Sequence, residues 1–159
     1  MRHALLALIA ALPLLSPSGP ALPKRPAHPA LPPTLRVAAV QMRSTRDLDA
    51  NTTHTIDLLR RCARDGVQVA VFPECSLSGY FDDLIPKLSA KQLADAEQRV
   101  AHACKDLGIC AIVGSPVRDG RQLYNSALVI DQTGKVRERY HKIQLAERWP
   151  DPGDHLSVF

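Results

Sequence analysis

Several patterns that would indicate a metal or nucleotide site are missing from this sequence. It has no C-x-x-C pair, no His at zinc-ligand spacing from its cysteines and no Gly-rich phosphate loop. We therefore expect neither a structural metal nor a cofactor. The four cysteines are expected to stay free and to pack as small core residues rather than form disulfides: Cys62, Cys75, Cys104 and Cys110.

Acidic residues are absent from residues 1–33, which contain Arg2, Lys24 and Arg25. Without these three, the 20 Lys and Arg of the chain fall to 17, against 16 Asp and Glu. The formal charge of +4 thus belongs to the N-terminal segment. The rest of the chain carries no excess of positive charge for a polyanion, and we predict no nucleic-acid partner.

Hydrophobic runs are short, and the one from Ala4 to Leu15 cannot span a bilayer as a helix. It follows Arg2 and precedes small residues, which predicts a signal peptide over 1–21, cleaved after Ala21. Eight of the 13 prolines precede residue 34, so 22–34 is predicted to be a Pro-rich linker. The expected protein is secreted or periplasmic, with no membrane anchor after cleavage. A disordered extension or a misplaced start codon, in a cytoplasmic protein, is the alternative.

The pattern from residue 35 onward begins with a strand, a helix and a second strand. The apolar segments 35–42 and 67–72 are the strands. Between them, apolar residues recur at helical spacing after Asp47 and Asp49, either of which could be the N-cap, and Gly66 suits the C′ position. Strands with apolar residues at consecutive positions are typical of a sheet covered on both faces. This order indicates an α/β fold.

A second helix and three further strands are predicted after this unit. Ser89 and Gln92 form a potential capping box for a helix over 89–107, which Gly108 would end. Strands follow at 109–119, 122–131 and 136–142, the last two joined by a hairpin turn that contains Gly134. A new apolar stretch, which looks like the start of a strand, begins at Leu156.

Two ionisable residues lie where apolar strands end. Glu74 follows the strand 67–72, and Lys142 ends the strand 136–142. Ligands of open α/β sheets bind at the carboxyl ends of strands, although such charges can also simply flank a sheet. Because side chains alternate along an extended chain, Cys75 should face away from Glu74 and pack internally.

Four segments together resemble the nitrilase, or carbon–nitrogen hydrolase, superfamily. They are LRVAAVQM, VAVFPECSLSGY, GRQLYNSALVID and GKVRERYHKIQL, in this order, and the resemblance covers residues 35 to 159. It implies an α-β-β-α four-layer sandwich, incomplete in this chain, of which 35–159 would be the N-terminal part. It also implies hydrolysis of a small-molecule amide or nitrile by a Glu, a Lys and a Cys.

The resemblance assigns roles to three residues. Glu74 matches the family's general base, Lys142 its catalytic lysine, and Glu147 a second glutamate that many members place nearby. The nucleophilic cysteine of the family follows the lysine by tens of residues, and no Cys lies between Lys142 and Phe159. We therefore expect this chain by itself to be inactive. Other residues of the resemblance are expected to serve packing and turns, and these are Tyr80, Tyr124 and Asn125.

Three functions remain open from the sequence. The first is a carbon–nitrogen hydrolase whose nucleophile lies outside this chain, and the resemblance implies that the full-length protein forms a homo-oligomer. The second is a non-catalytic half domain that binds a partner through its unfinished sheet. The third, a flavodoxin-like nucleotide-binding module, fits the β-α-β order but lacks a phosphate loop.

Overall fold

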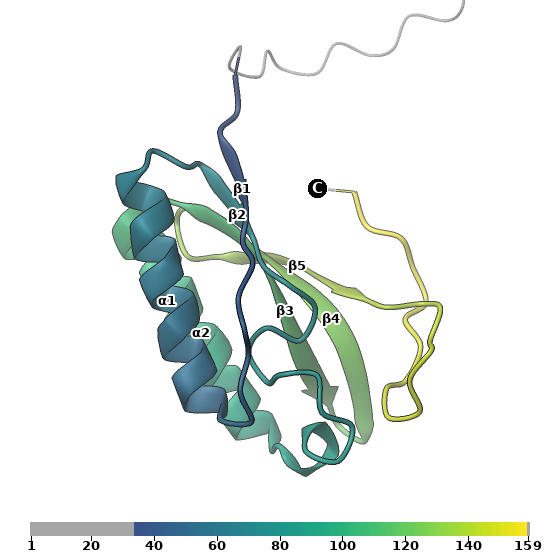
Figure 1. The fold of residues 1–159 in the computed structure, drawn as a ribbon. Coiled ribbons are helices and arrows are strands. Elements are labelled where there is room, and N and C mark those ends of the chain that lie inside the picture. Colours follow the sequence, from purple (N-terminus) through teal and green to yellow (C-terminus); the bar gives the residue numbers. More distant parts are fainter. Residues whose placement is uncertain (1–33, 159) are drawn as a thin grey trace, which may run out of the picture. The chain divides into compact units, whose positions relative to one another are not determined.

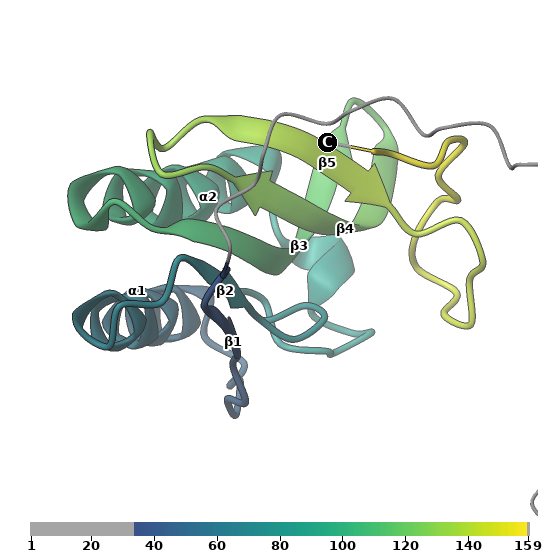
Figure 2. The ribbon, with the colours of Figure 1, turned by 90° about the horizontal axis from the view of Figure 1, so that it is seen from above.

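The computed structural model describes residues 34–158 as a five-stranded sheet with two long helices on one side (Figures 1 and 2). The strands lie in the order β1-β2-β3-β4-β5, the order in which they occur along the chain. The predicted signal peptide (1–21), and the predicted linker except for Thr34, lie outside the described residues. Within 34–158, no helix has the length and hydrophobicity that a bilayer crossing needs.

The predicted β-α-β unit is present. β1 (Val37–Ala39) and β2 (Val69–Val71) are parallel neighbours, connected by α1 (Leu48–Arg64). Asp47 is the N-cap of α1, and its carboxylate accepts hydrogen bonds from the amides of Asp49 and Ala50 at 2.9 and 3.0 Å. Both strands are shorter than predicted, because only three residues of each enter the ladder.

The second helix, α2 (Ala90–Leu107), begins and ends as predicted. Ser89 and Gln92 form the capping box, and Gly108 adopts the left-handed conformation with φ 64°. A short 3₁₀ helix, η1 (Ile85–Lys87), precedes it and was not predicted. Pro86 lies inside this turn, where its fixed φ favours helical geometry and its missing amide hydrogen is not required.

Three antiparallel strands complete the sheet, namely β3 (Cys110–Asp119), β4 (Gln122–Ile130) and β5 (Val136–His141). The hairpin turn between β4 and β5 is confirmed, with Gly134 at φ 77°. The sheet is therefore mixed, with β3 parallel to β2 and antiparallel to β4. The prediction of a strand beginning at Leu156 is wrong for residues 156–158, which are not part of any strand.

The core lies between the sheet and the two helices. Leu59 of α1, Val100 of α2, Val113 of β3 and Leu128 of β4 are fully buried in one cluster. Both helices lie on the same side of the sheet in Figure 2. The opposite side, which we call the open face, carries several residues that are only partly buried, namely Val71, Ile112, Ala127 and Tyr140.

Candidate active site

Glu74 lies in a turn that follows β2. After Val71, the amide of Phe72 still bonds to the carbonyl of Ile112 on β3 at 2.8 Å, and the chain then turns. Cys75 has φ 49°, in the left-handed region, so the chain here is not extended. Cys75 therefore does not follow the predicted strand alternation, but its expected packing role is confirmed, because Cys75 is fully buried.

Lys142 follows β5 directly and is held from two sides. Its amide donates to the carbonyl of Asn125 on β4 at 2.8 Å, and its own carbonyl accepts from the amide of Gly153 at 2.9 Å. Gly153 lies so close to β5 that a Cβ would be 2.3 Å from the carbonyl oxygen of His141. The chain after Lys142 therefore folds back along the ends of β4 and β5, and this return brings Glu147 to the lysine.

The three residues predicted for the site meet in one cluster. The Lys142 ammonium donates to Glu147 Oε1 at 2.6 Å and to Glu74 Oε1 at 3.1 Å. Asn125 Nδ2 donates to the same two carboxylates, at 2.6 Å to Glu74 and 3.3 Å to Glu147. The Tyr80 hydroxyl also donates to Glu147 Oε1.

Tyr80 and Asn125 were expected to serve packing and turns, whereas the structure places their polar atoms inside the cluster. Both residues stand in the segments that carry the family resemblance, VAVFPECSLSGY and GRQLYNSALVID. That position was the only available signal. An Asn on an apolar strand, 96% buried as this one is, also needs hydrogen-bond partners for its amide, and two carboxylates provide them.

The hydrogen bonds of the cluster fix its charge state. Burial by itself would raise the pKa of Glu147, but the bonds from Lys142 and Tyr80 outweigh it and lower the pKa to about 2. Bonds to Glu147 and then to Glu74 raise the pKa of Lys142 well above its usual value. The bond to Glu147 raises the pKa of Tyr80 to about 12. At neutral pH the lysine is thus an ammonium, Glu147 a carboxylate and Tyr80 a neutral phenol.

Exposure separates the two glutamates. The Glu147 side chain is 2% exposed and that of Glu74 48%, with Lys142 between them at 33%. A cavity of about 330 Å³ on the open face is lined by Glu74, Asn125 and Lys142 together with apolar strand residues. Glu147 therefore anchors the lysine from behind, while Glu74 and Lys142 face a space in which a small molecule could react.

None of the four cysteines is placed to act as a nucleophile beside Lys142. Cys75 is the nearest, and its Sγ contacts Asn125 Oδ1 at 3.6 Å, but burial and the charge of Glu74 raise its pKa to about 12. Cys104 is buried in α2, and burial also raises its pKa to about 12. Cys62 lies in α1, and Cys110 begins β3 at the opposite end of the strand from the cluster.

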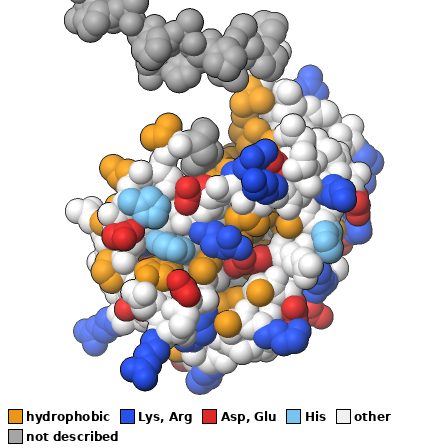
Figure 3. All heavy atoms as spheres, turned by 180° about the vertical axis from the view of Figure 1, so that it is seen from behind, with side chains coloured by type: hydrophobic (Ala, Val, Ile, Leu, Met, Phe, Trp, Pro, Cys, Tyr) orange, Lys and Arg blue, Asp and Glu red, His pale blue; other side chains and the backbone are white. Residues whose placement is uncertain are grey.

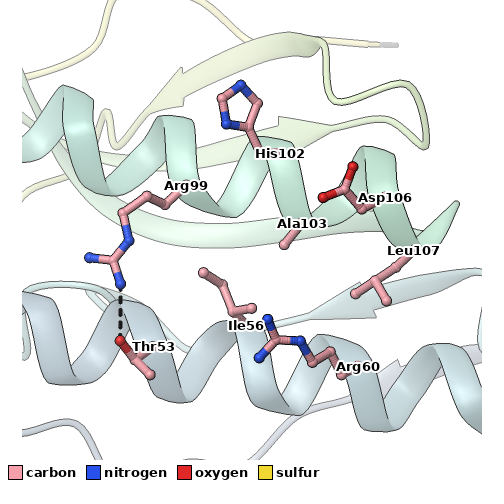
Figure 4. Close-up of a pocket in the computed structure, with 8 residues that line it drawn as sticks. All are labelled: Thr53, Ile56, Arg60, Arg99, His102, Ala103, Asp106 and Leu107. Atoms are coloured by element: carbon pink, nitrogen blue, oxygen red, sulfur yellow. Dashed lines mark hydrogen bonds between the residues drawn. The ribbon is translucent and has the colours of Figure 1, made fainter.

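A second cavity lies on the helical side, and none of the cluster residues line it. This cavity of about 370 Å³ lies between the helices and is lined by Thr53, Ile56 and Arg60 of α1 and by Arg99 and His102 of α2 (Figure 4). Arg99 crosses it and donates to Thr53 Oγ1 at 3.0 Å. Within 34–158, no group of three or more His, Cys, Asp or Glu could hold a metal ion.

Charged side chains on the side seen in Figure 3 are mixed, with Lys and Arg interspersed among Asp and Glu. Such a surface does not form the one-sign patch of a polyanion-binding protein. The expectation that nucleic acid is not a partner stays a prediction.

Comparison with known sequences identifies the family of this chain. Residues 36–159 match the carbon-nitrogen hydrolase family. The chain belongs to this family. It is 27% identical over 139 residues to the omega-amidase NIT2 of Bos taurus, and this match covers 79% of the chain and 50% of the relative. It is also 36% identical over 135 residues to the glutamine-dependent NAD(+) synthetase of Mycobacterium leprae (strain TN), covering 76% of the chain and 19% of that enzyme.

Solved structures give the same fold for this carbon-nitrogen hydrolase chain. An amidase from Nesterenkonia sp. superposes with a TM-score of 0.72 at 27% identity, over 78% of this chain and 51% of that one. The chain thus spans about half the length of the omega-amidases and amidases it matches. The α/β prediction of the nitrilase type is confirmed, and residues 34–158 supply a helical layer and a sheet layer of the predicted four-layer sandwich.

Proposed function

We propose that this protein takes part in the hydrolysis of a small-molecule amide, with Glu74 as general base and Lys142 as the stabiliser of the oxyanion. The observation that carries the proposal is the contact of 3.1 Å between the Glu74 carboxylate and the Lys142 ammonium beside an open cavity. The family supports carbon–nitrogen bond hydrolysis. An amide rather than a nitrile is favoured because the similar proteins are an omega-amidase and an amidase.

The proposed chemistry assigns a separate step to each group. Glu74 accepts the proton of a cysteine thiol, and the thiolate attacks the amide carbon. The Lys142 ammonium stabilises the negative oxygen of the tetrahedral intermediate. Glu74 returns its proton to the leaving nitrogen, so that ammonia or an amine departs and a thioester remains. Glu74 then deprotonates a water molecule, which attacks the thioester and releases the carboxylic acid and the thiol.

The thiol in this scheme is proposed to come from a cysteine outside these 159 residues, and the chain alone is proposed to be inactive. The burial or the distance of each of the four cysteines argues against their use. A structure of the Nesterenkonia amidase with acrylamide added at its active-site cysteine supports a cysteine nucleophile in a similar protein.

The first test is the intact mass of the untagged product isolated from its source. We expect a mass above 17.4 kDa and hydrolysis of short aliphatic amides by that product. Loss of a leader near residue 21 would support the proposed export, and the elution volume of the product would test the proposed homo-oligomer.

Substitutions then test the two roles. We expect Glu74→Gln and Lys142→Ala each to lower kcat/KM by about 10²-fold or more. Glu138→Gln and Lys135→Ala are matched controls, because Glu138 lies on β5 outside the cluster and Lys135 is exposed in the hairpin turn. Turnover close to that of the unmodified protein in either active-site variant would contradict the assignment.

The alternative is a non-catalytic half domain that binds a partner through the open face. The partial exposure of Val71, Ile112 and Ala127 and the 52% exposure of Val37 on the edge strand favour it. A native product of 17.4 kDa or less, without amide hydrolysis and in stable complex with another protein, would support this alternative over hydrolysis.

A further inference from the structure

To place Glu74 beside Lys142, the backbone that follows β2 has to cross part of the sheet. Glu74 follows β2 and Lys142 follows β5, and β3 and β4 lie between these strands. Neighbouring strands are about 4.8 Å apart, so β2 and β5 are separated by about 14 Å. The Glu74 carboxylate nevertheless lies 2.6 Å from Asn125 on β4 and 3.1 Å from Lys142. Side chains span only part of this distance, so the backbone after β2 has to move over β3.

Gly114 is the residue of β3 over which this backbone passes. A Cβ at Gly114 would lie 2.3 Å from the Pro73 carbonyl oxygen, 2.5 Å from the Cys75 nitrogen and 2.8 Å from the Glu74 carbonyl carbon. All three are backbone atoms, so no flexible side chain could yield to it. Its neighbour Val113 faces the helices, and a side chain at Gly114 would therefore point to the open face.

The reason for a glycine here is space rather than conformation. The backbone of Gly114 is not in the left-handed region, in contrast to Gly108 and Gly134, and any residue could adopt its conformation. Gly114 also holds the crossing segment in place. Its carbonyl oxygen accepts hydrogen bonds from the Ser76 hydroxyl at 3.1 Å and from the Leu77 amide at 3.2 Å.

We propose that Gly114 is a positioning residue that sets the height of Glu74 above the sheet. Its bare Cα lets the backbone of Glu74 cross β3, and its carbonyl fixes the crossing. Any side chain at this position lifts Glu74 away from Asn125 and Lys142. The placement of Glu74 follows from the geometry alone, whereas its value for catalysis rests on the proposed function.

The test follows the side-chain amide of Asn125 in a proton–nitrogen correlation spectrum of the isotope-labelled full chain. Glu74→Gln provides the reference shift for loss of the carboxylate, and Asn125→Ala identifies the resonance. We expect Gly114→Ala to move this resonance in the same direction as Glu74→Gln. Gly134→Ala is the matched control, because its Cβ would clash with the Ala101 carbonyl at 2.6 Å on the helical side. It should lower stability without moving the resonance.

A folded Gly114→Ala protein with an unchanged Asn125 resonance would overturn the proposal. If that variant does not fold, Ser76→Ala decides, since it removes the hydroxyl bond to Gly114 without adding volume. A smaller shift in the same direction supports the proposal, and no shift overturns it.

Kinetics of the active protein separate this inference from the proposed function. A displaced base should lower kcat about 10²-fold in Gly114→Ala while KM changes little. Full activity in this variant would refute the positioning role and leave the hydrolase assignment intact. A shifted resonance in Gly114→Ala, together with a native product that is longer than 159 residues and hydrolyses no amide, would support the positioning role and count against the hydrolase.

Discussion

Glu147 makes the charged cluster sensitive to acid. Its pKa is lowered from 4.5 to about 2, so the native state favours the carboxylate. The unfolded state binds a proton first as the pH falls, and the stabilisation by Glu147 is therefore complete above about pH 4.5 and is lost towards pH 2. Urea unfolding should show that Glu147→Gln costs stability at pH 7 and that the difference from the unmodified protein narrows below pH 4.5.

Glu138→Gln is the control for this effect, because Glu138 lies on β5 away from the cluster. A stability difference between Glu147→Gln and the unmodified protein that stays constant from pH 7 to pH 2 would contradict the role given to Glu147.

The sequence indicated Glu74 and Lys142 because each lies at the end of an apolar strand, and the end of an apolar run can be recognised from the sequence alone. Asn125 could not be found in this way, since it lies within a strand and its partners are 51 and 22 residues away. The packing of Cys75 was expected, but its backbone conformation was not, because a left-handed residue in a turn cannot be read from apolar alternation.

Helices were predicted more closely than strands, and the capping box of α2 shows why. Ser89 and Gln92 bond to each other's backbone amides within one turn, so the signal is entirely local.

We expect Ser89→Ala to lower the free energy of unfolding by about 1 kcal/mol, because the backbone amide of Gln92 loses its hydrogen-bond partner. Thermal unfolding of Ser89→Thr, which keeps the hydroxyl, should show a much smaller loss. Equal losses in both variants would argue against the cap.

Strand lengths depended on partners that no local pattern specifies. β1 was predicted over eight residues and has three, because residues on either side of Val37–Ala39 do not pair in register with β2. Gln68 and Phe72 flank β2 and still donate to Arg36 and Ile112, which extends the contact beyond the ladder. η1 was not predicted, because a single turn of three residues is too short to show a helical period.

The reactivity of the four thiols can be used to test the packing of the whole molecule. Cys75 and Cys104 are fully buried, whereas Cys62 and Cys110 are half-buried. A coloured thiol reagent at pH 8 should therefore react readily with two cysteines of the native chain and with all four after denaturation. The Cys62→Ala and Cys110→Ala variants should each lose one fast-reacting thiol. Rapid reaction of a third thiol would show that one of the two buried sites opens.

The agreement between strand order and chain order has a consequence for synthesis. Each of β2 to β5 pairs with the strand made just before it, so its partner is already synthesised when it emerges. The antiparallel pairs β3–β4 and β4–β5 join residues that are close in the sequence and should form fast, whereas the parallel pairs β1–β2 and β2–β3 join residues more distant in the sequence and should form more slowly. As the chain leaves the ribosome at about 5–20 residues per second, each new strand can join a sheet whose edge is already formed. We expect this sheet to grow by addition at one edge, from β1 towards β5, during translation.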